Sequence, residues 1–271
     1  MSHENLKTLE SNVNTELANI SDWLIANKLS LNTKKSSHLI FSPKNKRVNQ
    51  EVSIQINKEN LAEAQSVKYL GVLIDNKLNW KTHVQQTNLK ISKGVGVLAR
   101  LRHFVSKDIL ISIYNAFIQP HINYGIINWG GTYKSILDPV KKSMKRAVRL
   151  INFEPVTAHS KPLFNKLKLL SLDDSYKNEC AKFMFDINNN DLEKHFCDMF
   201  QLTSTRHPMR TRQATSGSFS QPIMRTNAKQ NSVINNGVKI WNSIPKDIRF
   251  CKSKFAFKKF LKIWLLENNC R

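Results

Sequence analysis

The chain has 271 residues, and its 42 Lys and Arg against 20 Asp and Glu give a formal net charge of +22. Hydrophobic residues make up 41% of it, which is enough for a folded core and excludes a wholly disordered chain. A positive excess of this size repels itself unless a polyanion balances it, so nucleic acid is the first partner we expect.

The sequence predicts neither a membrane segment nor a metal site. No run of 18 apolar residues occurs, and the opening MSHENLKTLE has no apolar signal segment. We therefore expect an intracellular protein, nuclear or cytoplasmic, with no membrane partner. The cysteines are too widely spaced for a zinc motif, and we expect reduced thiols at Cys180, Cys197, Cys251 and Cys270.

Residues 1–80 are predicted to combine one helix with short strands. Apolar residues from 6 to 24 recur at intervals of three and four, which is typical of an amphipathic helix. Alternation and turn residues predict strands at 38–41, 52–56 and 67–74, a turn at 75–76 and a return strand at 78–80.

Gly71 interrupts the third of these strands, in the run VKYLGVLIDNKLNW. A glycine inside a strand allows another backbone to approach closely. Two neighbours fit this position, a bound nucleic-acid backbone or a packed helix, and the residues alone leave both open.

After Trp80 the apolar periodicity becomes helical. A helix is predicted over 82–105, with Thr82 as its N-cap. Gly94 and Gly96 weaken this helix, which indicates close packing or a kink there. Its inward face is predicted to hold Val84, Ile91, Val95, Leu98 and Val105.

A second helix is predicted between Ser106, as its cap, and Pro120, which ends it. The side chains expected to face inward are Ile109, Leu110, Ile113 and Phe117.

The third predicted helix, residues 140–151, has one apolar face and one cationic face. At about 100° per residue, a single arc holds Val140, Met144, Ala147, Val148 and Ile151, and the opposite arc holds Lys141, Lys142, Lys145, Arg146 and Arg149. No acid occurs in 139–153, whereas a solvated surface usually mixes both signs. Contact with phosphates is the interpretation we favour, and a face that only keeps the protein soluble is the alternative.

Charge is most asymmetric between residues 81 and 150. Twelve Lys and Arg stand there against Asp108 and Asp138. Such a field attracts a nucleic-acid backbone, so we expect this region to bind an RNA/DNA or DNA duplex through its phosphates. The candidate residues are Lys81, Lys90, Lys93, Arg100, Arg102, Lys141, Lys142, Lys145, Arg146 and Arg149.

Residues 156–271 are predicted to form a helical C-terminal region. No acid occurs in 199–246, and the Ser-, Thr- and Arg-rich stretch around 201–232 predicts a flexible basic loop. A final helix places aromatic and aliphatic side chains in a core, at Phe257, Phe260, Leu261, Trp264 and Leu265.

Several motifs, in order, resemble a known family. KYLGVLIDNKLNWKTHV, LKISKGVGVLARLRHF and IYNAFIQPHINYGIINWG are similar to the region after the catalytic palm in reverse transcriptases of non-LTR (LINE-type, jockey-like) retrotransposons. WLIANKLSLNTKKSSHLIF resembles the family's stretch just after its catalytic Asp-Asp strand, and GVKIWNSIPKDIRFCKSKFAFKKFLK resembles the family's C-terminal tail. Together these motifs cover most of the chain.

The resemblance implies roles for particular residues. Tyr69, Leu70 and Gly71 match the primer grip, a hairpin that seats the 3′ end of the primer. Lys35, which follows Asn32 in an Asn-x-x-Lys pattern, matches a lysine that assists the pyrophosphate leaving group. Residues 81–151 match the thumb, whose helices hold the template–primer duplex.

The family's catalytic carboxylates, which bind two divalent ions, lie before the primer grip, and we expect this chain to start after them. Asp173 and Asp174 lack the aromatic residue and strand pair of the family motif, so they are predicted to begin a helix. A nuclease site using these two residues and Glu179 is the weakest hypothesis. The chain alone is thus expected to be inactive, with Mg²⁺ needed only by the complete polymerase.

The sequence predicts an α+β fold with a palm remnant and β-hairpin in 1–80, a thumb-like helical domain in 81–155 and a helical region in 156–271. The predicted function is that of a fragment of an RNA-directed DNA polymerase that binds template–primer nucleic acid. The missing upstream half is a second expected partner, since residues 1–80 expose edges it would cover. The alternative is a basic interaction module with no specific nucleic-acid role.

Overall fold

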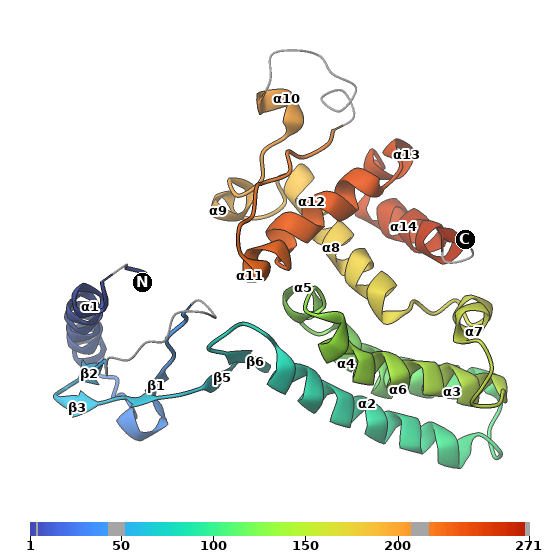
Figure 1. The fold of residues 1–271 in the computed structure, drawn as a ribbon, viewed down its shortest axis with the longest axis horizontal. Coiled ribbons are helices and arrows are strands. Elements are labelled where there is room, and N and C mark those ends of the chain that lie inside the picture. The colour runs from blue at the N-terminus through green and yellow to red at the C-terminus, as the bar shows by residue number, and fades with distance from the viewer. Residues whose placement is uncertain (4, 43–51, 207–216, 269–271) are drawn as a thin grey trace. The chain divides into compact units, whose positions relative to one another are not determined.

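The computed structural model describes residues 1–3, 5–42, 52–206 and 217–268, which fold as two compact units, Met1–Leu78 and Asn79–Arg271 (Figure 1). Short strands occur in the first unit and helices dominate the second, which confirms the predicted α+β class. Cys270 and residues 207–216 of the predicted loop lie outside the described residues. The further division at residue 155 stays a prediction.

In its described residues the first unit contains a long helix and three two-stranded sheets. Its elements are α1 (Leu6–Ala26), η1 (Thr33–Lys35), β1 (Ser37–His38), β2 (Gln55–Ile56), β3 (Glu59–Asn60), β4 (Ala62–Glu63), β5 (Ser66–Tyr69) and β6 (Val72–Asp75). The β1–β4 pair is parallel, and the β2–β3 and β5–β6 pairs are antiparallel hairpins. The Asn14 side chain joins α1 to the β2 segment, because it donates to the carbonyl of Ser53 (3.0 Å) and accepts from the amide of Gln55 (2.9 Å).

The strand predicted over 67–74 is wrong, because a hairpin turn divides it. Leu70 (φ 45°) and Gly71 (φ 85°) form a two-residue turn between β5 and β6, with Tyr69 paired to Val72. Such turns need positive φ at both central residues, a conformation that glycine adopts without strain. Gly71 is exposed at this turn. The return strand predicted at 78–80 is also absent from these described residues.

The regular elements of the second unit, among its described residues, are helices, apart from an isolated antiparallel bridge between Leu202 and Phe219. The longer helices are α2 (Lys81–Leu101), α3 (Lys107–Phe117), α6 (Lys134–Asn152), α8 (Leu172–Asn188), α12 (Val233–Ser243) and α14 (Lys254–Asn268). The shorter ones are α4 (Gln119–Asn123), α5 (Ile126–Trp129), α7 (Ser160–Lys166), α9 (Lys194–Cys197), α10 (Thr203–Arg206), α11 (Asn227–Gln230) and α13 (Lys246–Arg249).

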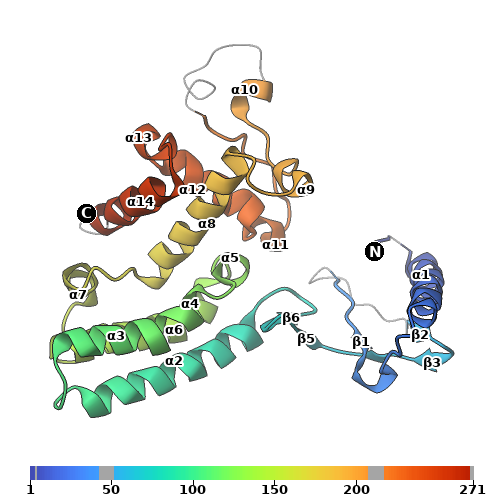
Figure 2. The ribbon, with the colours of Figure 1, turned by 180° about the vertical axis from the view of Figure 1, so that it is seen from behind.

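Two hydrophobic clusters formed by described residues stabilise this unit, and α8 contributes to both. The first gathers side chains of α2 to α8, and its Tyr176 and Cys180 come from α8. The second joins Met184 and Phe185 of α8 to α12 and α14. Figures 1 and 2 show α8 extending from the neighbourhood of α4 and α5 to α12 and α14. The C-terminal helices are therefore packed on the helices that precede them.

The predictions for the α2–α3 region were right in part. Val84, Ile91, Val95 and Leu98 are buried as expected, and Val105 is half-buried in the turn after α2. Thr82 is not the N-cap, because α2 begins at Lys81, whose amide bonds to the side chain of Asn79 (2.8 Å). Packing explains Gly94, since a Cβ there would lie 2.7 Å from Cγ1 of Ile118, but nothing lies within 4 Å of a Cβ at Gly96.

Two of the inward side chains predicted for α3 are wrong. Ile109 and Phe117 are about half exposed, whereas Leu110 and Tyr114 are buried. Apolar residues occur on both sides of this helix, so the spacing alone could not select the buried face. Phe260 of α14 is likewise exposed, while Phe257, Leu261 and Leu265 are buried as predicted.

Candidate nucleic-acid interface

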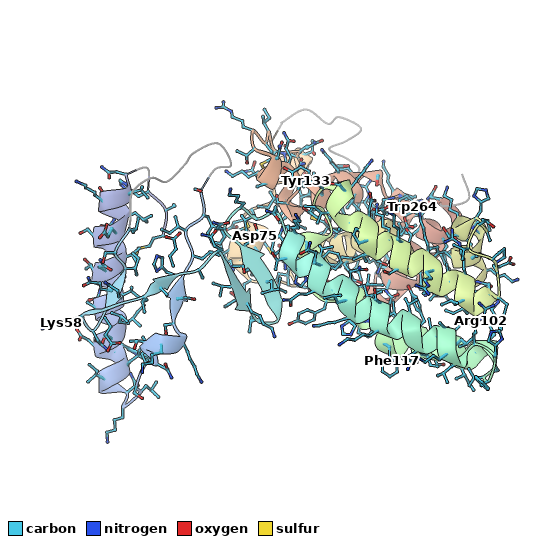
Figure 3. The ribbon with its side chains drawn as sticks, turned by 60° about the horizontal axis from the view of Figure 1, so that its bottom comes forward. Lys58, Asp75, Arg102, Phe117, Tyr133 and Trp264 are labelled. Carbon is cyan, nitrogen blue, oxygen red and sulfur yellow. The ribbon has the colours of Figure 1, made fainter. Side chains whose placement is uncertain are left out.

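Helices α2 and α6 lie side by side and run in the same direction (Figure 3). Their N-terminal ends meet where Thr132 Oγ1 donates to the carbonyl of Asn79 (2.9 Å), and their middles meet where Ser143 Oγ donates to Asn88 Oδ1 (2.8 Å). Their C-terminal ends meet where the guanidinium of Arg102 lies 5.2 Å from the ring centre of Phe153. The pair therefore forms one layer of about 30 Å, at about 1.5 Å per residue.

The core side of each helix fixes where its other side chains point. On α6, the five apolar side chains predicted to be inward, from Val140 to Ile151, are fully buried. At about 100° per residue, Lys142, Lys145 and Arg146 fall on the opposite arc. On α2, Lys93 and Arg100 fall opposite the buried side chains in the same way. The α2–α6 layer faces the viewer in Figure 3, with α3 packed against both helices.

We call Lys93, Arg100, Lys142, Lys145 and Arg146 the cationic face. All five are exposed, and none forms an ion pair with another described residue. The layer thus presents positive charge that the described part of the chain does not neutralise. Lys81 and Lys90 are also exposed, at the shoulders of α2 rather than on its outermost arc.

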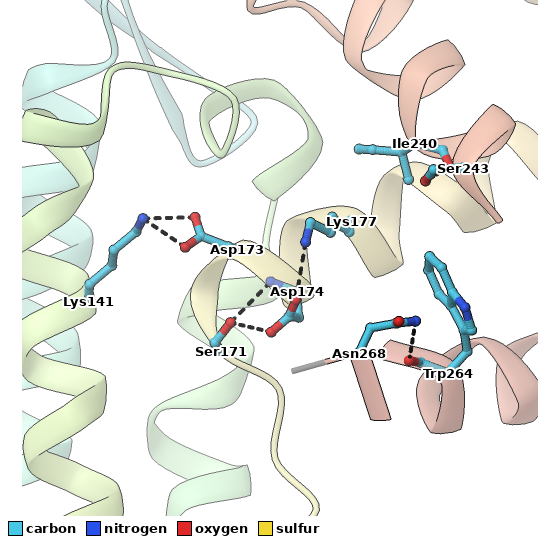
Figure 4. Close-up of polar contacts among 9 residues, drawn as sticks. All are labelled: Lys141, Ser171, Asp173, Asp174, Lys177, Ile240, Ser243, Trp264 and Asn268. Atoms are coloured by element: carbon cyan, nitrogen blue, oxygen red, sulfur yellow. Dashed lines mark hydrogen bonds and ion pairs between the residues drawn. The ribbon is translucent and has the colours of Figure 1, made fainter. Parts of the chain in front are cut away.

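Three of the predicted contact residues form contacts within the protein. Lys141 Nζ lies 2.8 Å from the Asp173 carboxylate at the start of α8 (Figure 4). Arg149 Nε donates to the carbonyl of Ala158 (2.8 Å), and Arg102 stacks on Phe153. These contacts use groups that the sequence assigned to phosphates.

His83, the last residue of the motif LNWKTH, is buried beside the indole of Trp129, with ring centres 5.8 Å apart. Burial, and secondarily the nearby charge of Lys90, lowers the pKa of His83. Burial and Lys90 also lower the pKa of His121. Both histidines are therefore held in the neutral form by the folded state.

Stability should consequently fall as the pH drops below about 6.5, the usual pKa of histidine. In that range His83 binds a proton in the unfolded chain but not in the folded one. The free energy of unfolding therefore falls by up to about 1.4 kcal/mol per pH unit for each such proton. A His83→Gln variant should lose less stability than the parent between neutral and mildly acidic pH, as measured by urea unfolding. An equal loss in both proteins would contradict this assignment, since His121 remains in each.

The two candidate sites of the first unit are exposed. Tyr69 is 64% exposed and Leu70 74%, at the turn of the β5–β6 hairpin. Lys35 ends η1, where its amide bonds to the side chain (3.2 Å) and the carbonyl (3.1 Å) of Asn32. Asn32 thus caps the short turn that displays Lys35.

The carboxylates of the nuclease hypothesis, all on α8, form ion pairs with lysines. Asp173 and Asp174 lie in the first turn of α8, as predicted, and Ser171 caps this helix. Asp174 bonds to Ser171 and to Lys177 (3.5 Å), as Figure 4 shows, and Glu179 pairs with Lys182 (2.5 Å). In the described residues no three His, Cys, Asp or Glu gather as a metal site.

None of the helices in the described ranges combines the length and apolar character of a membrane span. Sequence reasoning missed the polar contacts that align the α2–α6 layer, such as Asn88 with Ser143. It also missed the aromatic side chains at the C-terminal end of this layer. The signal for one of them was available, since Phe153 follows α6 at the place where glycine is usual.

The chain is similar to curated proteins of mobile elements. The chain is 24% identical over 162 residues, 58% of its length, to the RNA-directed DNA polymerase from mobile element jockey of Drosophila melanogaster, and 24% identical over 214 residues, 78% of its length, to the probable RNA-directed DNA polymerase from transposon X-element of the same species. It is 22% identical over 166 residues, 60% of its length, to the jockey polymerase of Drosophila funebris.

These matches cover 17%, 21% and 18% of the three relatives, so the chain spans about a fifth of their length. No family model matches the chain. No solved structure matches it either.

Proposed function

We propose that this chain, a relative of the RNA-directed DNA polymerases of jockey-like non-LTR elements, is the C-terminal part of such a polymerase and holds its template–primer duplex. The observation that carries the proposal is the cationic face of the α2–α6 layer. Five exposed cations without an ion-pair partner among the described residues lie along about 20 Å of the layer, from Lys142, beside the Ser143–Asn88 contact, to Arg100. That length corresponds to about six base pairs.

The same proposal gives the first unit its roles. The exposed turn Tyr69-Leu70-Gly71 would contact the primer end, and Lys35 would assist the leaving group in the complete enzyme. We assign nucleotide addition, and the Mg²⁺ it requires, to carboxylates of the complete polymerase rather than to this chain. The chain would act inside the cell, nuclear or cytoplasmic, where template RNA and DNA occur.

Salt dependence tests this function directly. Each phosphate neutralised by Lys or Arg releases condensed counterions, so log K should fall linearly with log salt at about −0.9 per contact. Full use of the five residues of the cationic face predicts a slope of about −4.5 for a blunt RNA/DNA or DNA duplex. Unrelated duplex sequences should bind equally, because phosphates carry no base information. Absence of binding, or binding insensitive to salt, would overturn the proposal.

A further inference from the structure

We propose, on the basis of the function above, that the C-terminal end of the α2–α6 layer stacks unpaired bases of single-stranded nucleic acid. The α2–α3 turn and the segment after α6 meet at this end, near the Arg102 label in Figure 3. We call Phe104 and Phe153, with Arg102 and His103, the aromatic tip.

Phe153 occupies a backbone position that suits glycine. It is the C-cap of α6 with φ 59°, a left-handed conformation that a bulky residue rarely adopts. Its ring lies under the guanidinium of Arg102 at 5.2 Å and meets the edge of the His103 ring, with centres 6.4 Å apart. The side chain is nevertheless 48% exposed. The ring therefore joins the ends of α2 and α6 through Arg102, while about half of its surface remains accessible to a further partner.

Phe104 contributes less to the fold. It is 83% exposed, and its amide, which donates to the carbonyl of Leu101 (2.9 Å), would form that bond with any side chain. Phe104 and Phe153 belong to two segments that meet at the same end of the layer, and Val156 beyond them is also exposed. Flat apolar surface of this kind is covered well by a planar partner.

Charge favours a nucleobase over an apolar protein partner. Arg102 belongs to the tip itself, Lys107 donates to Asn152 Oδ1 (2.9 Å) next to Phe153, and the cationic face leads to the tip through Arg100. The nearby acids are Asp108 and Glu154. Aromatic side chains beside a cationic track are the usual combination for binding single strands, because every base can stack and every phosphate is attracted. A strand that follows the face from Lys142 toward Arg100, about 20 Å, reaches the tip.

The experiment compares a blunt duplex with the same duplex carrying a single-stranded extension, using the full chain and fluorescence anisotropy. The extension should raise the affinity of the parent. Phe104→Ala should lower the affinity for the extended duplex about tenfold. The same variant should bind the blunt duplex like the parent, with the same salt slope, because it changes no charge. Phe104→Trp should keep the gain.

Phe255→Ala is the matched control, since Phe255 is 79% exposed on α14. It should leave the affinity for both duplexes unchanged. If the parent does not bind the blunt duplex, the proposed function fails. If it binds that duplex but the extension adds nothing, or Phe104→Ala retains the whole gain, the stacking site is refuted while the proposed function stands.

Discussion

Replacing Lys142, Lys145 and Arg146 together by glutamate should lower the affinity for a blunt duplex about a hundredfold near 0.1 M salt. The salt slope should decrease by about three, since three phosphate contacts are lost. These side chains point away from the buried face of α6 and form no ion pair with other described residues, so the fold should survive. Anisotropy titrations at several salt concentrations measure both quantities.

A control variant carries the same change of charge on another exposed surface. Lys258, Lys259 and Lys262 of α14 are exposed, and their triple replacement by glutamate alters the net charge equally. If the cationic face makes the contact, this control should retain most of the affinity and nearly the full salt slope. Equal losses in the two variants would mean that only net charge matters, as the alternative of a general basic module requires.

The choice of residues depends on what the sequence could not reveal. Periodicity predicted the two faces of α6 correctly, because every apolar position repeats at helical spacing. It could not show that Lys141 is paired with Asp173, which is 32 residues away in sequence and belongs to another helix. Nor could it show that Arg149 bonds to a carbonyl beyond the end of α6. Reversing these two residues would test stability as much as binding.

Local turn geometry set a similar limit in the first unit. The run Val67–Ile74 is apolar enough for a single strand, yet positive φ at Leu70 and Gly71 folds it into a hairpin. Glycine was the signal for the turn, and its interpretation as a close approach inside a strand placed the turn five residues too late. The exposed hairpin itself follows from the family resemblance more directly than from alternation of side chains.

Gly131→Ala should destabilise the second unit by about 3 kcal/mol, the upper part of the range for overpacking a core. A Cβ at Gly131 would clash with the backbone carbonyl of Asn231 and would lie 2.6 Å from Oη of Tyr176 and 3.0 Å from Nδ2 of Asn236. Neither the carbonyl nor the Tyr176 hydroxyl, which accepts from Asn236 Nδ2 (3.2 Å), can move without disturbing the contact between α8 and α12. The methyl group added by Gly131→Ala would therefore push the contact between α8 and α12 away from the segment after α5.

Gly96→Ala is the matched change, because nothing lies within 4 Å of a Cβ at that position. It should stabilise the unit by about 1 kcal/mol through helix propensity alone. Urea unfolding of both variants gives the two free energies, and limited proteolysis of Gly131→Ala should show earlier cleavage after α5 than in the parent. If Gly131→Ala lowers the free energy of unfolding and Gly96→Ala raises it, the result supports packing of the C-terminal helices on the α2–α6 layer. Similar small changes in both variants would mean that this packing is loose.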